Sequence, residues 1–570
     1  MIDDHARMLP SRPTRRTKAL TGVAGAFTAA LLASGMAAEP AQAAAPMSCA
    51  SLASATIANT TITQATSVAA GTTIGGTTVS TAICRVVGVV STKPGEQVGI
   101  EVWLPTTDWN GRLEGVGNGG FGGVIVYSAL EAGVARGFAT ANTDTGHTGG
   151  TSGQIGQPLP WVENKVSLKD WGHTSIHLMT VAAKKIIHDF YGKTAKYAYY
   201  DGCSTGGAEG MEEAEFYPDD YDGIHAGSPG QDYSHLMMSF LWGGLLPAEN
   251  PAATLTTAAL TLLNTAVLQQ CEGSQAVQDG FLLHPRACHY DPAQLLCQSG
   301  QDPSTCLTAP QVQEAERLYS AVRDPVTGLK LYPGFVRGSE SQWALIQGLL
   351  VGAYAQPLLA NAVFDNPNWD WTTFNFDSDA FLVDKKLSPY INAINPDLHP
   401  LKSHGKLIVT QGWADALNAQ TLPIEYYDSV VLDQGSLGAT ESFYRLFMVP
   451  GMSHCGGGPG PNTVGGSTPP TEITAQRDVL TALQAWVEDG IAPAKFIATK
   501  YVGDKPANGI LLERPLCPYP EVIRYRGGDT SQASSYECAS DENGFAADIT
   551  QEQKNVLTDA LIGDLQNLPN

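Results

Sequence analysis

Positive charge is scarce in this 570-residue chain, which holds 33 lysine and arginine residues against 56 aspartate and glutamate residues. The formal net charge is −23 at pH 7. Nucleic acids and anionic membranes attract proteins through clustered lysine and arginine side chains. The composition therefore argues against both as partners, and it says little about a small substrate.

Long, strongly apolar runs are also missing, with one weak exception near the N-terminus. Residues 19–36 are small, apolar and uncharged, and Ala41-Gln42-Ala43 follows them as an A-x-A site. A basic segment precedes them, with Arg7, Arg12, Arg15, Arg16 and Lys18. This order predicts a signal peptide over residues 1–43 and a secreted protein, because an Ala- and Gly-rich stretch makes a poor membrane anchor. Arg15-Arg16 also fits twin-arginine export.

Removal of residues 1–43, with five basic and three acidic side chains, would leave a net charge of −25. The chain also contains no C-x-x-C pair, which argues against a zinc ribbon. All ten cysteines follow residue 43, and an even number in an exported chain predicts disulfides. Their spacing leaves the connectivity open. The simplest local pairing is Cys49–Cys84, Cys271–Cys288, Cys297–Cys306 and Cys517–Cys538, which leaves Cys203 with Cys455.

The order of strand and helix patterns predicts an α/β fold with a parallel sheet and crossover helices. Strand patterns occupy 84–90, 97–104, 112–117 and 196–200, and helical patterns occupy 174–191 and 205–216. Residues 231–400 interrupt this alternation with Leu-rich helical stretches and four cysteines. The alternation returns with strands at 406–410 and 444–449 and a helix at 474–486. We therefore expect a catalytic domain of residues 44–230 and 401–570, with 231–400 inserted as a lid.

A candidate nucleophile lies between a predicted strand and a predicted helix. Gly202-Cys203-Ser204-Thr205-Gly206 matches G-x-S-x-G, and this context is typical of the strained turn that raises a serine above the sheet edge. In the α/β-hydrolase fold the acid and the histidine follow in that order, each after a strand. The strand at 406–410 leads to Asp415, and the strand at 444–449 leads to His454. Asp428 and Asp433 are the nearest alternative acids, but neither directly follows a strand.

The cysteines support this triad independently. Cys203 precedes Ser204, and Cys455 follows His454. A triad brings the serine oxygen to about 3 Å from the histidine nitrogen. The neighbouring cysteines would then lie near the roughly 4.4–6.8 Å Cα separation of a disulfide. A Cys203–Cys455 bond would tie the nucleophile turn to the histidine loop.

The predicted chemistry is acyl transfer in two steps. His454 takes the proton of Ser204 as the serine attacks an ester carbonyl, and Asp415 orients the imidazole. The backbone N–H of Thr205 and one N–H of the Gly119–Gly120 loop are the candidate oxyanion donors. Water then releases the acid, and this chemistry requires no cofactor.

Four segments carry a family resemblance: Asp201-Gly-Cys-Ser-Thr-Gly-Gly207, Tyr217-Pro-Asp-Asp-Tyr-Asp-Gly223, Val409-Thr-Gln-Gly-Trp-Ala-Asp415 and Pro450-Gly-Met-Ser-His-Cys-Gly-Gly457. With them the chain resembles the tannase and feruloyl esterase family, which includes a hydrolase of mono(2-hydroxyethyl) terephthalate. The resemblance implies a hydrolase core with an inserted lid, the disulfide pairs given above, and a small aromatic ester or an esterified plant polymer fragment as the substrate. Galloyl, feruloyl and terephthaloyl esters are all compatible with it.

The resemblance also implies a calcium loop in the lid, of the form Cys-Asp-x-x-Asp-Gly-x-x-Asp-Gly. This chain departs from that form at Cys271-Glu-Gly-Ser-Gln-Ala-Val-Gln-Asp-Gly280. The candidate ligands are the side chains of Glu272, Gln275 and Asp279 and the backbone oxygens of Val277 and Phe281. Gln275 stands where the family form has a carboxylate. One lost charge weakens cation binding, so the alternative is a lid loop held by Cys271–Cys288 without a metal.

Lid residues are the expected substrate contacts, with Arg337, Trp343 and Phe335 as the candidates. A second departure is Ala208-Glu209, where relatives often have Arg or Gln; we expect it to alter the rim of the site. Two other functions stay open. One is an acyltransferase that uses the same acyl-enzyme, and the other is a non-catalytic secreted binding protein on this scaffold.

Overall fold

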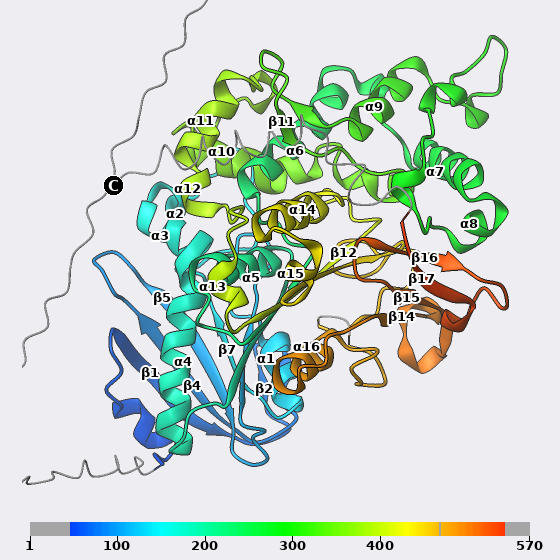
Figure 1. The fold of residues 1–570 in the computed structure, drawn as a ribbon. Helices are drawn as coiled ribbons and strands as arrows, with labels where there is room; N and C mark the ends of the chain where they lie inside the picture. Colours follow the sequence, from blue (N-terminus) through cyan, green and yellow to red (C-terminus); the bar gives the residue numbers. More distant parts are fainter. Residues whose placement is uncertain (1–45, 467–468, 542–570) are drawn as a thin grey trace, which may run out of the picture. The chain divides into compact units, whose positions relative to one another are not determined.

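The computed structural model describes residues 46–466 and 469–541, so the predicted signal peptide lies outside the described residues. A mixed nine-stranded sheet forms the centre, in the order β1-β4-β5-β7-β6-β8-β9-β12-β13 (Figure 1). The pairs from β1 to β7 along this order are antiparallel, and the pairs from β7 to β13 are parallel. The strands are β1 Thr60–Val68, β4 Ile83–Val90, β5 Val98–Pro105, β6 Arg112–Val116, β7 Ala139–Thr143, β8 Tyr197–Cys203, β9 Gly223–Gly227, β12 Lys406–Gly412 and β13 Tyr444–Val449.

Helices cover both faces of this sheet. One face packs against α4 (Ser175–Tyr191), α5 (Thr205–Phe216) and α14 (Leu422–Gln434) in the largest apolar cluster. The other face packs against α1 (Tyr127–Ala135) and α16 (Val479–Asp489). The three layers and the serine-bearing turn between β8 and α5 confirm the α/β-hydrolase architecture.

Three strands and one helix boundary differ from the sequence patterns. β7 and β9 are buried at every position but consist of small and polar residues, so they lack an apolar signal. β1 is a Thr-rich edge strand with mostly exposed positions. The predicted helix at 474–486 begins at Val479, because the Asp478 side chain caps it by accepting from the Thr481 N–H.

The segment between the neighbouring strands β9 and β12 forms the lid, green in Figure 1, which lies beyond the carboxyl ends of the parallel strands. Its interior is two apolar clusters. Its elements are α6 Tyr233–Glu249, α7 Thr257–Cys271, α8 Gly273–Asp279, α9 Ala309–Tyr319, β10 Val322–Arg323, β11 Lys330–Tyr332, α10 Gln356–Ala362, α11 Ser378–Lys386, α12 Ser388–Ile391 and α13 His399–Lys402.

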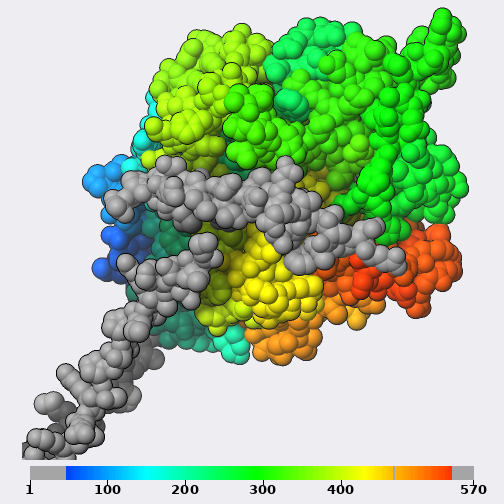
Figure 2. Space-filling model, turned by 45° about the horizontal axis from the view of Figure 1, so that its top comes forward, coloured from blue at the N-terminus to red at the C-terminus, as the bar shows by residue number. Residues whose placement is uncertain are grey.

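Two C-terminal hairpins complete the described chain: β14 (Phe496–Tyr501) with β15 (Ile510–Leu516), and β16 (Glu521–Tyr525) with β17 (Tyr536–Ser540). In Figure 2 these orange-red hairpins lie directly against the green segment that carries α7 and α8. Shorter elements are β2 Thr73–Ile74, β3 Thr77–Thr78, α2 Pro160–Glu163, α3 Lys165–Lys169 and α15 Leu437–Glu441. Every helix in the described part of the chain is too short or too polar to span a bilayer.

All five predicted disulfide pairs form, with Cα–Cα separations of 4.9 to 5.9 Å. Four close short local loops, and Cys203–Cys455 bridges 252 positions of sequence. The fold therefore carries one long-range covalent link, between the turn after β8 and the loop after β13.

Candidate active site

Ser204 occupies a strained turn at the end of β8. Its φ of 67° and ψ of −121° are unfavourable for a residue with a side chain. The turn is tight enough to require glycine on both sides. A Cβ at Gly206 would lie 2.9 Å from the Asn118 oxygen, and a Cβ at Gly202 would collide with the Gly206 oxygen. The G-x-S-x-G pattern thus has the steric origin that the sequence predicts.

The structure brings the three predicted catalytic side chains together. His454 Nε2 lies 2.7 Å from Ser204 Oγ, and His454 Nδ1 lies 2.8 Å from Asp415 Oδ2. Asp415 is fully buried, whereas Ser204 and His454 are partly exposed. A hydroxyl that can reach an incoming substrate is thereby hydrogen-bonded to a base, and that base is oriented by a buried carboxylate.

Asp415 is held rigidly by its own loop. Its Oδ1 accepts from the backbone N–H groups of Leu417 at 2.8 Å and Asn418 at 3.1 Å, and its Oδ2 accepts from Gln411 Nε2 at 3.1 Å. The Gln420 amide donates to the Asp415 carbonyl oxygen and accepts from the Val336 N–H of the lid. The lid therefore helps to place the acid.

The predicted disulfide joins the serine turn to the histidine loop. Cys203 and Cys455 have a Cα–Cα separation of 5.9 Å, within the range that the triad geometry predicts. Cys455 has a φ of 59°, so the residue that follows the histidine is in a left-handed conformation. The bond therefore ties the serine turn covalently to the histidine loop.

The predicted oxyanion donors lie beside Ser204. The Thr205 hydroxyl donates to the Gly120 oxygen at 2.6 Å, and the Gly206 N–H donates to the Asn118 oxygen at 2.9 Å. These bonds hold the loop against the N-terminus of α5. Within the described residues, the N–H groups of Thr205, Gly119 and Gly120 donate to no other group, so they are available to a ligand. A Cβ at Gly120 would collide with the Thr151 oxygen, and its φ of 56° also favours glycine.

Ala208 and Glu209 lie beneath the nucleophile turn and do not form the rim of the site. Ala208 is 2% exposed and Glu209 is fully buried, because both face inward from α5. Glu209 Oε2 accepts from the Asn118 N–H at 2.9 Å and from the Tyr200 hydroxyl at 2.7 Å. Burial raises the pKa of Glu209 to about 7, although these hydrogen bonds oppose the shift. Glu209 thus anchors the oxyanion loop.

An aromatic cluster from distant segments packs around the oxyanion loop. Phe121 of that loop makes edge-to-face contacts with Trp161, Trp171 and Tyr354, at centroid distances of 5.3 to 5.9 Å. The Tyr354 hydroxyl would lie 3.2 Å from a Cβ at Gly120. Trp161 and Tyr354 are partly exposed, so they can contact a substrate. Their sequence positions showed no signal, because large aromatic side chains are mostly buried in a core.

Two of the three predicted lid contacts, Trp343 and Phe335, are buried and unavailable to a substrate, which corrects the expectation for them, whereas Arg337 is partly exposed. Trp343 is fully buried and Phe335 is 6% exposed, both within the lid's own apolar core. The Arg337 guanidinium stacks over the Tyr319 ring at 4.0 Å, and its Nε donates to the Tyr290 oxygen. These large side chains therefore make contacts within the lid.

The predicted calcium ligands do not form an oxygen cage. The Gln275 amide nitrogen donates to Asp279 Oδ1 at 2.8 Å, so it presents a donor where a cation needs an oxygen. The Glu272 carboxylate accepts from the backbone N–H groups of Leu283 and His284. Asp279 pairs with an arginine of the C-terminal hairpin. Val277 and Phe281 were predicted to contribute backbone oxygens only, so their side chains, the first exposed and the second buried, supply no ligand. The residues present do not fit the cation.

With this geometry established, comparison with known proteins assigns the family. The family model described as tannase and feruloyl esterase matches residues 84–539. The chain belongs to this family. The match includes the serine turn, the lid, the acid loop and the histidine loop.

Individual members of the tannase and feruloyl esterase family align over most of the chain. An uncharacterized esterase of Xanthomonas campestris pv. campestris is 35% identical over 503 residues, covering 82% of this chain and 86% of that protein. The probable feruloyl esterase B-1 of Aspergillus oryzae is 32% identical over 471 residues, covering 80% and 84%. The chain is accordingly a carboxylic ester hydrolase of this family.

Solved structures of the family share the fold. The crystal structure of feruloyl esterase B from Aspergillus oryzae superposes with a TM-score of 0.79 at 30% identity, covering 86% of this chain and 99% of that one. The tannin acyl hydrolase from Aspergillus niger superposes with a TM-score of 0.66 at 20% identity, covering 86% and 93%. The architecture of core plus lid is therefore common to the family.

Proposed function

We propose that this chain is a secreted serine esterase that hydrolyses esters of phenolic and other aromatic acids through a Ser204–His454–Asp415 triad and an acyl-enzyme. The observation that carries the mechanism is the continuous hydrogen-bond chain from Ser204 Oγ through His454 to the buried Asp415. The relatives named feruloyl esterase support the acyl class. Five disulfides support an oxidising, extracellular location.

In the first step Ser204 Oγ attacks the ester carbonyl carbon while His454 Nε2 takes the hydroxyl proton. The negative charge that forms on the carbonyl oxygen is met by the N–H of Thr205 and an N–H of Gly119 or Gly120. The C–O bond to the alcohol then breaks, and His454 returns its proton to the departing oxygen. Asp415 keeps the imidazole in one tautomer and stabilises its charged form.

In the second step water replaces the alcohol. His454 removes a proton from the water as its oxygen attacks the acyl carbon, and the proton then passes to Ser204 Oγ as the acyl–serine bond breaks. The free acid leaves and the serine is restored. The original serine proton leaves on the alcohol, and a proton from water replaces it on Ser204 Oγ. The triad is thereby restored, and the reaction consumes ester and water alone.

Aromatic surface beside the oxyanion loop supports an aromatic acyl group. Trp161 and Tyr354 are partly exposed and both contact Phe121, the residue after Gly120, near where the carbonyl of the ester must lie. One face of the Trp161 ring is stacked on His147, so the other face is the one left for a substrate. Rings of this kind bind flat aromatic groups through apolar area and edge-to-face contacts. We therefore expect a small aromatic ester, free or on a plant polymer fragment, to bind with its ring against this wall.

The test is hydrolysis of an ester panel by the purified wild type and by Ser204→Ala. The panel holds methyl ferulate, methyl gallate, mono(2-hydroxyethyl) terephthalate and a short p-nitrophenyl ester. We expect turnover of at least one aromatic ester, reduced roughly 10⁵-fold or more in Ser204→Ala. Ser239→Ala, the same change on lid helix α6, is the matched control and should retain activity, since its hydroxyl bonds only within the helix.

A trapped intermediate tests the acyl-enzyme separately. Mass spectrometry of acid-quenched enzyme should show the mass of one acyl group on the peptide that contains Ser204. Turnover that survives Ser204→Ala would reject the triad. Absence of turnover for the whole panel by folded protein would favour an acyltransferase or a binding protein, and transfer to an added alcohol would identify the first.

A further inference from the structure

The lid loop between Cys271 and Cys288 lies directly against the catalytic histidine loop. A Cβ at Gly451 would lie 2.6 Å from the Phe281 Cβ, and a Cβ at Gly280 would lie 3.0 Å from the Pro459 Cβ. Gly451 is three positions before His454. Whatever holds residues 279–281 in place therefore also supports the loop that carries the catalytic base.

A buried arginine from the C-terminal hairpin holds this loop. Arg514 of β15 has 1% side-chain exposure, and its Nη2 lies 2.7 Å from Asp279 Oδ2. Its Nη1 donates to the carbonyl oxygen of Thr530 at 2.7 Å. The guanidinium carbon lies 5.5 Å from the Phe281 ring centroid and 4.4 Å from that of Tyr536. Nη1 also donates to the carbonyl oxygen of Glu513 at 2.9 Å. One cation is thus bound by a carboxylate, two carbonyl oxygens and two aromatic rings.

The remaining carboxylate oxygens of the loop also have donors. Asp279 Oδ1 accepts from Gln275 Nε2 at 2.8 Å. Glu272 Oε1 accepts from the His284 N–H at 2.7 Å, and Glu272 Oε2 accepts from the Leu283 N–H at 2.9 Å. All four carboxylate oxygens that a divalent cation would need are thus already bound to N–H groups. A calcium ion takes six to eight oxygen ligands, which this arrangement does not offer.

We infer that the Arg514 guanidinium takes the structural place of a divalent cation in this lid loop and clamps the loop onto the catalytic histidine loop. A planar guanidinium can satisfy a buried carboxylate without extra oxygen ligands, because it is always charged and presents several donors. Gln275 in place of a carboxylate is consistent with this, since one negative charge fewer balances a monovalent cation. The lid of this chain is therefore independent of calcium.

The first experiment measures the thermal midpoint of the full secreted chain with 5 mM EDTA or 5 mM CaCl2, and its calcium content after purification. The readouts do not require ester hydrolysis, so they are separate from the proposed function. We expect the same midpoint in both solutions and far less than one calcium per chain. A midpoint that rises by several degrees with calcium, or one bound calcium per chain, would overturn the inference.

Variants then test the clamp itself. Arg514→Met leaves the mostly buried Asp279 carboxylate without its cation, and we expect the thermal midpoint to fall by about 5 °C. Arg514→Lys keeps the positive charge but has only one donor nitrogen, so its thermal midpoint should lie between those of Arg514→Met and the wild type. It replaces Arg514→Met in the test if that variant does not fold. Arg112→Met removes a comparable ion pair with Glu488 far from the lid and is the matched control.

A double variant asks whether the position accepts a metal once the guanidinium is gone. Arg514→Met with Gln275→Asp frees Asp279 and restores a carboxylate beside it. We expect CaCl2 to raise its thermal midpoint, whereas Arg112→Met should show no such response. Two results would contradict the idea that the guanidinium replaces a divalent cation. One is a thermal midpoint of Arg514→Met equal to that of the wild type, and the other is a double variant whose thermal midpoint does not change with CaCl2.

Discussion

Ser204 and Cys455 show how single residues set the geometry of this site. Both have positive φ values, 67° and 59°, which cost free energy for residues with side chains. The cost is tolerated because Ser204 lies between a buried strand and a buried helix, and Cys455 is bonded to its neighbour Cys203. Backbone strain at the two positions orients the serine and the histidine before substrate arrives.

Asp415→Asn tests the orienting acid at this scale. An asparagine amide in this position favours the wrong imidazole tautomer while it preserves shape, so we expect kcat to fall by roughly 10³- to 10⁴-fold. The measurement is steady-state kinetics on the ester that the wild type hydrolyses best. Asp428→Asn is the matched control, since this buried acid bonds to Tyr519 and not to His454. Equal losses in the two variants would reject the assignment of Asp415.

Glu209→Gln tests the buried carboxyl beneath the serine turn. The folded-state pKa is raised to about 7 from an ordinary 4.5, so the folded protein keeps a proton that the unfolded chain has lost between these values. Stability therefore falls as the pH rises from 4.5 to 7, by up to roughly 3 kcal/mol. Glutamine does not titrate, so the thermal midpoint of Glu209→Gln should fall less between pH 5 and pH 8 than that of the wild type. An unchanged pH dependence would contradict the shift.

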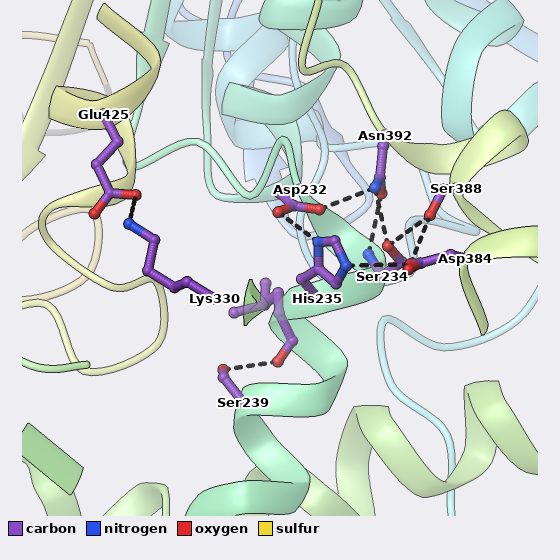
Figure 3. A network of polar contacts seen from close by, with 10 residues as sticks. Asp232, Ser234, His235, Ser239, Lys330, Asp384, Ser388, Asn392 and Glu425 are labelled. Carbon is purple, nitrogen blue, oxygen red and sulfur yellow. Dashed lines mark hydrogen bonds and ion pairs between the residues drawn. The ribbon is translucent and has the colours of Figure 1, made fainter. Parts of the chain in front are cut away.

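At the scale of elements, a half-buried histidine on α6 links the start of the lid to its last helices. Figure 3 shows His235 between two carboxylates: Nδ1 lies 2.8 Å from Asp232 Oδ2, and Nε2 lies 3.1 Å from Asp384 Oδ1. Asn392 extends the network by donating to Asp232 at 2.9 Å. The groups come from the loop after β9, from α11 and from the end of α12, so the network joins the start of the lid to its last helices.

His235→Gln tests this junction through its pH dependence. Burial lowers the pKa of His235, but the two carboxylates outweigh it and raise the pKa well above the ordinary 6.5. The stabilisation from charged His235 and its two carboxylates is fully present below pH 6.5, and it is lost as the pH rises through the folded-state pKa of His235. We expect the wild-type thermal midpoint to fall more than that of His235→Gln between pH 6 and pH 9. His399→Gln, at an exposed histidine, should leave the wild-type slope unchanged.

Over the whole molecule, one disulfide joins the first and last parts of the catalytic layer. Cys203–Cys455 closes a loop with a sequence separation of 252 that includes the entire lid. The chain-entropy estimate for such a loop is about 5 kcal/mol, against about 2–3 kcal/mol for Cys297–Cys306 with a separation of 9. Each cysteine of the Cys203–Cys455 disulfide is also adjacent in sequence to a residue of the proposed triad.

The paired variants Cys203→Ala/Cys455→Ala and Cys297→Ala/Cys306→Ala test this difference. We expect the first to lose more stability in guanidinium unfolding and also to lose kcat, because the serine and histidine loops separate. The second should lose less stability and retain kcat, since it lies in the outer lid. Similar kcat values in both variants would show that the long disulfide does not position the triad.

The positions of the proposed triad and the simplest cysteine pairing could be predicted from the sequence because both depend on local patterns. Ser204, Asp415 and His454 each come directly after a strand, and the carboxyl ends of neighbouring parallel strands meet at one edge of a sheet. The sequence therefore determined the catalytic centre before any distance was known. It determined less of the sheet, since β7 and β9 are too small and polar in composition to show a pattern.

Only the tertiary structure decided what the lid does. Trp343 and Phe335 turn inward to build the lid core, while Tyr354 reaches the oxyanion loop from a segment with no distinguishing signal. Arg514 binds Asp279 across 235 positions of sequence. Such contacts depend on how whole elements pack, and packing is a property of the complete set of neighbours. A local pattern cannot encode which distant side chain will supply the compensating charge.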